Sequence, residues 1–133
     1  MLLKLKTNSR GFTLVEIMIV IAIIALLATV AMPNYLRSRK RSQATEILED
    51  LRLIDSAVDQ YALEYSKIMG NSVSWPDVQI YLKPGSRLYA SGGADILGNA
   101  FTMPTVDTAP KVSAATFAAL SDVAPNDFWS PYR

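Results

Sequence analysis

Two hydrophobic patterns follow each other in the first half of the chain. From Ile17 to Leu36, 20 consecutive residues carry no charge, and a helix of this length would span about 30 Å, the thickness of the hydrocarbon core of a bilayer. From Ile47 onward, apolar residues alternate at spacings of four and three, which predicts an amphipathic helix with a heptad seam. The seam consists of Ile47, Leu51, Ile54, Val58, Tyr61, Tyr65 and Ile68.

The amphipathic stretch also has a polar face and a stop signal. Gly70 and Asn71 readily adopt the left-handed conformation that ends helices. We therefore predict a membrane-spanning assembly helix over residues 12–36 that continues as an amphipathic helix over residues 37–69. The face opposite the seam is acidic and is expected to lie in solvent or in a polar groove; it carries Glu46, Glu49, Asp50, Asp55, Asp59 and Glu64.

Residues 70–133 are divided into short pieces by prolines and glycines, a pattern that predicts short strands and turns. The predicted fold class is therefore α+β, with the long N-terminal helix packed against a small C-terminal domain of antiparallel β-sheet and loops. Within this domain we expect a short helix over Trp75–Leu82, a turn entering a strand over Asp95–Met103, a short helix over Ser113–Leu120, and Phe128 and Trp129 covering the sheet or its edge.

Composition excludes several classes of function. Half of the 133 residues are hydrophobic, and 18 of the 21 residues from Phe12 to Met32 are apolar, as in one small domain joined to one membrane segment. A net charge of +1 creates no field that would gather nucleic acid. The absence of cysteine and histidine removes disulfides, thiolate ligands and the commonest general base. An anchored enzyme would have only scattered acids such as Asp77, Asp95 and Asp107, so no catalysis is expected.

Glu16 stands out because it directly precedes the uncharged run. An ionised group at the centre of a membrane helix costs roughly 2.5–3.5 kcal/mol, and less near the interface, so it needs a partner or a function. Thr13 and Glu16 have the spacing of a capping box, in which an acid in the first turn also complements the helix dipole. Alternatively, Glu16 pairs with a positive charge supplied by another chain.

The charges that flank the apolar run do not determine its orientation. Three basic residues precede it (Lys4, Lys6 and Arg10) and four follow it (Arg37, Arg39, Lys40 and Arg41), a difference too small for the positive-inside rule. We expect the second group to contact lipid headgroups rather than DNA. Pro33 removes one backbone donor near the end of the run, so a kink or a loosened turn is expected there.

Residues 10–28 begin with Arg-Gly-Phe-Thr-Leu-Val-Glu and continue as an apolar run to Ala28. This segment resembles the start of type IV prepilins and of the pseudopilins of type II secretion systems. The resemblance implies that a prepilin peptidase removes the leader, residues 1–11, by cutting between Gly11 and Phe12 on the cytoplasmic side, and then methylates the amine of Phe12. It also implies a single pass through a bacterial inner membrane, with the C-terminal domain in the periplasm.

The same resemblance implies a structural subunit of an inner-membrane-anchored helical filament, the pseudopilus of type II secretion. In the family the carboxylate matching Glu16 neutralises the amine matching Phe12, in a neighbouring or the same subunit, and loosening near Pro33 would let the helix repack during assembly. The implied partners are further copies of the chain, the prepilin peptidase, an assembly platform protein with its ATPase, and minor pseudopilins. Two alternatives stay open: a type IV pilus subunit for adhesion, motility or DNA uptake, and a signal-anchored binding module that never polymerises.

The resemblance extends less clearly to the C-terminal residues. Asp95–Phe101 is similar to the Asp-x-x-Gly-Asn-x-aromatic segment of major pseudopilins, which often also carry a calcium site. The only dense group of oxygen ligands here is Ser121, Asp122, Asn126 and Asp127, and its spacing matches no calcium loop. We therefore expect a solvated polar loop and no cofactor, with a calcium site at this loop as the alternative that stays open.

Overall fold

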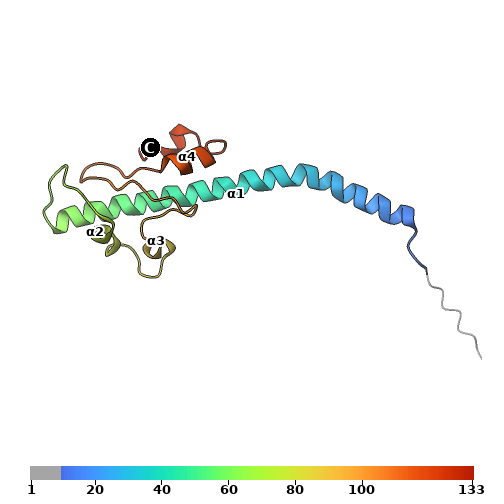
Figure 1. Ribbon diagram of the computed structural model, residues 1–133, viewed down its shortest axis with the longest axis horizontal. Helices are drawn as coiled ribbons and strands as arrows, with labels where there is room; N and C mark the ends of the chain where they lie inside the picture. The colour runs from blue at the N-terminus through green and yellow to red at the C-terminus, as the bar shows by residue number, and fades with distance from the viewer. Residues whose placement is uncertain (1–9) are drawn as a thin grey trace, which may run out of the picture. The chain divides into compact units, whose positions relative to one another are not determined.

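The structure is a computed structural model that describes residues 10–133 (Figure 1). It divides after Leu36 into two units. The first unit holds the apolar stretch, and the second comprises Arg37–Arg133. The basic leader residues Lys4 and Lys6 lie outside the described residues. The helices are α1 (Leu14–Glu64), α2 (Trp75–Gln79), α3 (Arg87–Ala90), α4 (Ala114–Leu120) and α5 (Asn126–Trp129).

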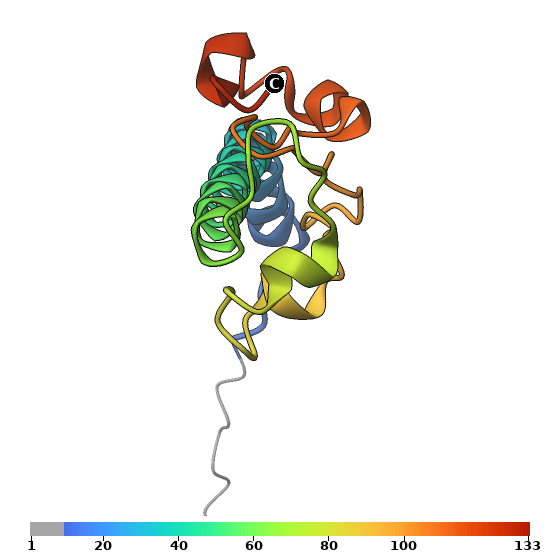
Figure 2. The same ribbon diagram turned by 90° about the vertical axis from the view of Figure 1, so that its left-hand side faces the viewer.

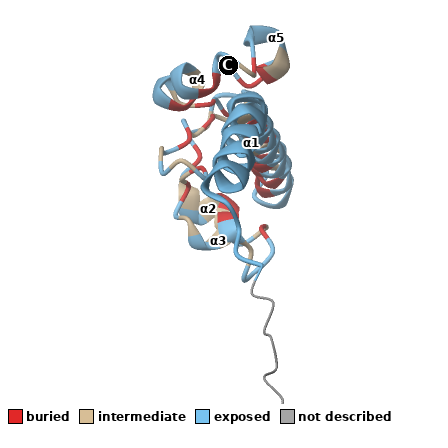
Figure 3. Ribbon diagram, turned by 90° about the vertical axis from the view of Figure 1, so that its right-hand side faces the viewer, coloured by how far each residue is buried: buried red, intermediate tan, exposed pale blue. Residues whose placement is uncertain are grey.

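In the first unit, α1 is apolar and unburied. Its most apolar 18-residue window has a mean hydropathy of 2.9, and none of this window is buried by the described residues. The helix is long and apolar enough to cross a membrane, in agreement with the predicted span. Figure 3 shows this part of α1 in the colour of exposed residues.

In the second unit, one face of α1 forms the spine of the hydrophobic core. Ile47, Leu51 and Ile54 are fully buried, as the predicted seam requires. Burial of each side chain contributes about 1.5–3 kcal/mol to the stability of the folded state. The C-terminal segments lie along this face of α1 (Figure 2). They contribute Val78, Leu82, Leu88, Phe101, Val112, Leu120 and Trp129 to the same core.

The seam ends earlier than predicted. Tyr65 and Ile68 are 54% and 74% exposed, because α1 stops at Glu64 rather than near Gly70. Ser66 adopts a positive φ of 48°, and the amide of Lys67 donates to the carbonyl of Ala62 at 2.9 Å. This is the pattern of a Schellman cap, with serine at the position that glycine usually occupies.

The predicted antiparallel sheet is wrong. Among residues 10–133 the structure has no strand, only isolated antiparallel bridges that pair Ser72 with Thr105, Ala94 with Ala100, and Thr102 with Lys111. Thr102 and Lys111 exchange both backbone hydrogen bonds, at 3.1 and 3.2 Å. The ladder cannot extend two residues further, because Pro104 has no N–H to donate. The C-terminal residues are therefore helical turns and loops laid on α1.

The short helices were predicted in part. The segments predicted at Trp75–Leu82 and Ser113–Leu120 contain α2 and α4. Phe128 and Trp129 lie in α5 and cover no sheet; the Trp129 side chain is fully buried, and its indole N–H donates to the carbonyl of Ala124 at 3.0 Å. The pattern did not reveal α3, whose only buried residue is Leu88.

Candidate functional site

The candidate processing site lies just before α1. Gly11 and Phe12 precede the helix, and both are exposed, with 83% of Phe12 accessible. A Cβ built on Gly11 would have no atom of the described chain within 4 Å. The fold itself therefore makes no demand for glycine at this position, and such a demand would have to come from a partner.

Glu16 caps α1 in the isolated chain. The amide of Glu16 donates to Thr13 Oγ1 at 3.2 Å, and the amide of Thr13 donates to Glu16 Oε2 at 3.3 Å. This is the reciprocal capping box expected from the spacing. Glu16 Oε1 makes no hydrogen bond with any residue of the described range, so one carboxylate oxygen remains available to a partner. Pro33 lies inside α1, in its exposed apolar stretch.

The basic cluster after the apolar stretch contacts the C-terminal loop. Lys40 Nζ and Asp122 Oδ2 form a salt bridge of 3.0 Å, and Arg41 Nη1 donates to the carbonyl of Val123 at 3.4 Å. The hydrogen bond from Lys40 holds the pKa of Asp122 below its usual value, and the charge of Arg37 acts in the same direction.

Asp122 belongs to the polar group considered above for calcium. In the structure, the Asp122 carboxylate forms its salt bridge with Lys40. Within residues 10–133, no three Asp or Glu side chains converge as metal ligands.

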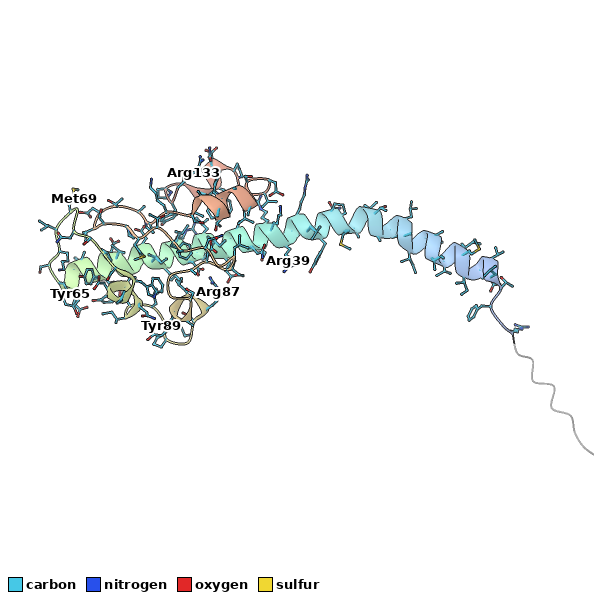
Figure 4. The ribbon with its side chains drawn as sticks, in the orientation of Figure 1. Arg39, Tyr65, Met69, Arg87, Tyr89 and Arg133 are labelled. Carbon is cyan, nitrogen blue, oxygen red and sulfur yellow. The ribbon has the colours of Figure 1, made fainter. Side chains whose placement is uncertain are left out.

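One acid of the predicted polar face is buried. Asp50 is 7% exposed and pairs with Arg87 of α3, whose Nε also donates to Glu46 Oε1 at 2.8 Å. Figure 4 shows Arg87 beside α1. Burial raises the pKa of Asp50, and the guanidinium partly opposes that shift. Of the two surroundings expected for this face, solvent or a polar groove, Asp50 has the second, although the pattern gave no sign that α3 would supply the cation that covers it.

The Asp-x-x-Gly-Asn segment is a buried hydrogen-bonded turn. Asp95 Oδ1 accepts from the amides of Leu97 and Asn99 at 2.9 and 3.0 Å, and Asp95 Oδ2 accepts from the hydroxyl of Thr116 in α4. Thr116 Oγ1 also accepts from Asn99 Nδ2 at 2.9 Å. The carboxylate thus ties the turn to α4, a role for Thr116 that only its position three residues after the Ser113 N-cap could have suggested.

The three scattered acids do not form a common site. Asp95 is surrounded by its donors, and Asp77 accepts from the amide of Ser74 at 2.9 Å at the start of α2. Asp107 is exposed in a turn with a φ of 66°. These positions give each acid a local structural role or an exposed turn, without the grouping that acid–base catalysis needs.

Comparisons with known proteins identify a family model and several relatives that are similar to this chain. Residues 6–32 match the family model described as the prokaryotic N-terminal methylation motif. The type II secretion system core protein G of Klebsiella pneumoniae is 33% identical over 92 residues, which cover 65% of this chain and 63% of that protein. The chain therefore carries a prepilin methylation motif, and its resemblance to pseudopilins is confirmed.

Fimbrial proteins are also similar. The fimbrial protein of Neisseria meningitidis serogroup B is 41% identical over 70 residues, covering 53% of this chain and 41% of that protein. The type IV major fimbrial protein FimA of Dichelobacter nodosus is 28% identical over 123 residues, covering 92% and 69%. The chain spans 63% and 44% of the length of the core protein G of K. pneumoniae and of Klebsiella michiganensis. No solved structure matches the chain.

Proposed function

We propose that this chain is a structural subunit of a helical filament anchored at a bacterial inner membrane, the pseudopilus of type II secretion. One observation carries the proposal: the methylation motif, residues 6–32, includes the start of α1, and the most apolar window of this helix is left unburied by the rest of the described chain, so it is open to partners. The similarity to core protein G supports the secretion machine. Filament subunits act by assembly, so the proposal includes no catalysis.

Processing would precede assembly. A prepilin peptidase would cut between Gly11 and Phe12 on the cytoplasmic side and methylate the amine of Phe12. The C-terminal domain would lie on the opposite side of the membrane, in the periplasm. The exposure of both residues supports access by a protease. The open space around Gly11 supports the view that the peptidase, and not the fold, requires glycine at this position. A residue without a side chain can approach the catalytic carboxylates of the peptidase closely.

Glu16 would then set the register between subunits. Its Oε2 remains on the Thr13 amide, while Oε1 is available to the methylated amine of a neighbouring Phe12. A carboxylate left without that cation in an apolar bundle is penalised, so each subunit would dock at the axial offset that pairs the two groups. Pro33 leaves the carbonyl of Thr29 without its helical donor, which would let α1 adjust as subunits leave the membrane. The platform protein, its ATPase and minor pseudopilins would act at this step.

A type IV pilus subunit is the second candidate. The similarity to FimA, which covers 92% of this chain, favours it. Genetic complementation distinguishes the two: the proposed subunit restores protein export to a secretion mutant that lacks its major pseudopilin, whereas a pilin restores surface fibres to a pilus mutant. A binding module that never polymerises would restore neither.

The first test is the intact mass and N-terminal sequence of the protein purified from its native membrane. The expected result is a chain that lacks Met1–Gly11 and carries one methyl group on Phe12. A Gly11→Ala variant is the matched control and should accumulate at full length in the membrane. A full-length native protein, or cleavage near Ala31, would contradict the proposal and indicate an anchored or secreted domain.

A further inference from the structure

A groove opens beside the residues that follow the apolar stretch. Arg37, Ser38 and Arg41 of α1, with Asp122 and Val123 of the loop between α4 and α5, line a space of about 480 Å³. Arg37 and Arg41 are four residues apart and therefore share one face of the helix. Among the residues that the structure describes, Arg37 forms no salt bridge.

The cationic groups of this groove are only partly neutralised. Arg41 contacts the carbonyl of Val123 at 3.4 Å and lies 5.9 Å from the ring centroid of Phe128, and neither contact removes its charge. The one carboxylate that lines the groove, Asp122, is paired with Lys40. Arg37, Lys40 and Arg41 therefore outweigh Asp122 by two positive charges.

The charge of the second unit is strongly polarised along the sequence. Four of its ten basic residues occupy the first five positions, 37–41. From Ser42 to Arg133, six Lys and Arg stand against eleven Asp and Glu, a net charge of −5. An anion is thus attracted to the groove and repelled by the rest of the unit.

We propose that this groove binds the phosphate of an anionic phospholipid headgroup, held between the guanidinium groups of Arg37 and Arg41 with the Ser38 hydroxyl as a further donor. Arg37 directly follows Leu36, the last residue of the uncharged run, so headgroup phosphate is the anion concentrated at this depth. Guanidinium groups match phosphate through paired N–H donors. The inference rests on the membrane insertion contained in the proposed function.

The test measures lipid retained by the full chain. The protein is reconstituted in vesicles of equal parts phosphatidylglycerol and phosphatidylcholine, extracted in mild detergent, and examined by native mass spectrometry. Lipid held only by a flat membrane surface is removed by detergent, whereas lipid in a groove stays bound. Arg37→Gln is expected to lower the retained ratio of anionic to zwitterionic lipid about fivefold, the effect of one basic group near a membrane surface.

Two variants make the test specific to the groove. Arg39→Gln removes the same charge from the side of α1 that faces away from α4, and should leave the ratio unchanged (Figure 4). Asp122→Asn removes the carboxylate and frees Lys40, and should raise the ratio, which a misfolded chain would not do.

Three outcomes would overturn the inference: equal retention by the wild type and Arg37→Gln, an equal loss with Arg39→Gln, or displacement of the lipid by excess inorganic phosphate. The last would show that the groove takes free phosphate. Insertion is scored separately by resistance to carbonate extraction. A wild-type chain that fails to insert contradicts the proposed function, whereas an inserted chain without lipid preference contradicts only the groove.

Discussion

At the scale of single residues, Glu16 has a local role and a proposed intermolecular one, and its two carboxylate oxygens allow both. Oε2 accepts the Thr13 amide, which lies on the C-terminal side of the proposed cleavage site and is retained after processing. Oε1 is the oxygen available to a neighbouring amine. Substitutions that separate hydrogen bonding from charge can therefore distinguish the two roles.

Glu16→Gln keeps an oxygen for the Thr13 amide, because glutamine also serves in a capping box, but it removes the charge. We expect this variant to be processed and inserted normally while its filament yield falls at least about tenfold, the effect of losing roughly 1.4 kcal/mol of subunit pairing. Thr13→Val is the matched control: it removes the hydroxyl cap at a cost of about 0.5–2 kcal/mol and keeps the charge, so filaments should persist.

Filament yield is measured by electron microscopy and by quantifying the sheared fraction, with processing checked by intact mass. If Glu16→Gln assembles and Thr13→Val does not, capping is the sole role of Glu16.

Asp50 gives a pH-dependent prediction. Burial raises its pKa from the ordinary 3.8, with Arg87 opposing the shift. The folded chain therefore binds this proton more tightly than the unfolded chain does. The stability contributed by Asp50 is fully present below pH 3.8 and is lost as pH rises through the raised pKa.

Asp50→Asn retains an oxygen for Arg87 and cannot ionise. We expect its free energy of unfolding to improve relative to wild type as pH rises through this window. Denaturant titrations of the full chain in detergent at a series of pH values measure the difference. Asp59→Asn, at an exposed position on the same helix, is the control and should show a smaller change. A difference for Asp50→Asn that does not vary with pH would refute the assigned cause.

At this scale, the sequence revealed residues whose role follows from their neighbours along the chain. The pairing of Thr13 with Glu16 was predictable because a capping box has a fixed spacing. The burial of Asp50 was not, because it depends on Arg87, 37 residues away. Helical periodicity assigns a residue to a face but does not reveal what later covers that face.

At the scale of elements, α4 shows how a buried polar network positions a short helix. The Thr116 hydroxyl donates to Asp95 and accepts from Asn99 and Ser113, and the Thr116 side chain is fully buried. Seven residues are too few for a helix to be stable alone, so α4 depends on these contacts and on the core.

Thr116→Val keeps the shape of the side chain and removes its hydroxyl, leaving Asp95 short of one donor inside the protein. The expected cost is about 1–3 kcal/mol of unfolding free energy, because a buried charged group loses a hydrogen bond. Thr102→Val, at an exposed position, is the control and should cost much less. The comparison is made by thermal unfolding of the full chain in detergent. Equal stabilities for the two variants would contradict the proposed anchoring role.

The elements differ in how far they could be predicted. The long helix and its seam from Ile47 to Tyr61 repeat over four turns, so the pattern identified them reliably. The prediction of a sheet was wrong because extended segments that pack on a helix show the same short apolar alternation as strands. The sequence showed Pro104 as a residue that interrupts strands, and this proline ends the pairing at Thr102. It did not show that Lys111 would be the residue that pairs with Thr102.

At the scale of the whole molecule, folding and assembly are assigned to different units. Every buried hydrophobic residue of the described chain lies between Ala44 and Tyr132, within the second unit. The residues proposed for processing and register, Gly11, Phe12 and Glu16, lie in the first unit, which buries none of its described side chains. The second unit should therefore fold without the first, and the first should be needed for filaments.

A fragment of residues 37–133 tests this separation. We expect it to be soluble and helical by circular dichroism, to unfold cooperatively, and to form no filaments. Trp129→Ala in the same fragment should cost about 3–5 kcal/mol, since it empties a fully buried site in the core. An aggregated fragment, or one without a cooperative transition, would show that the core needs the apolar half of α1. A folded fragment that polymerises would place the assembly contacts in the second unit and remove the reason for assigning register to Glu16.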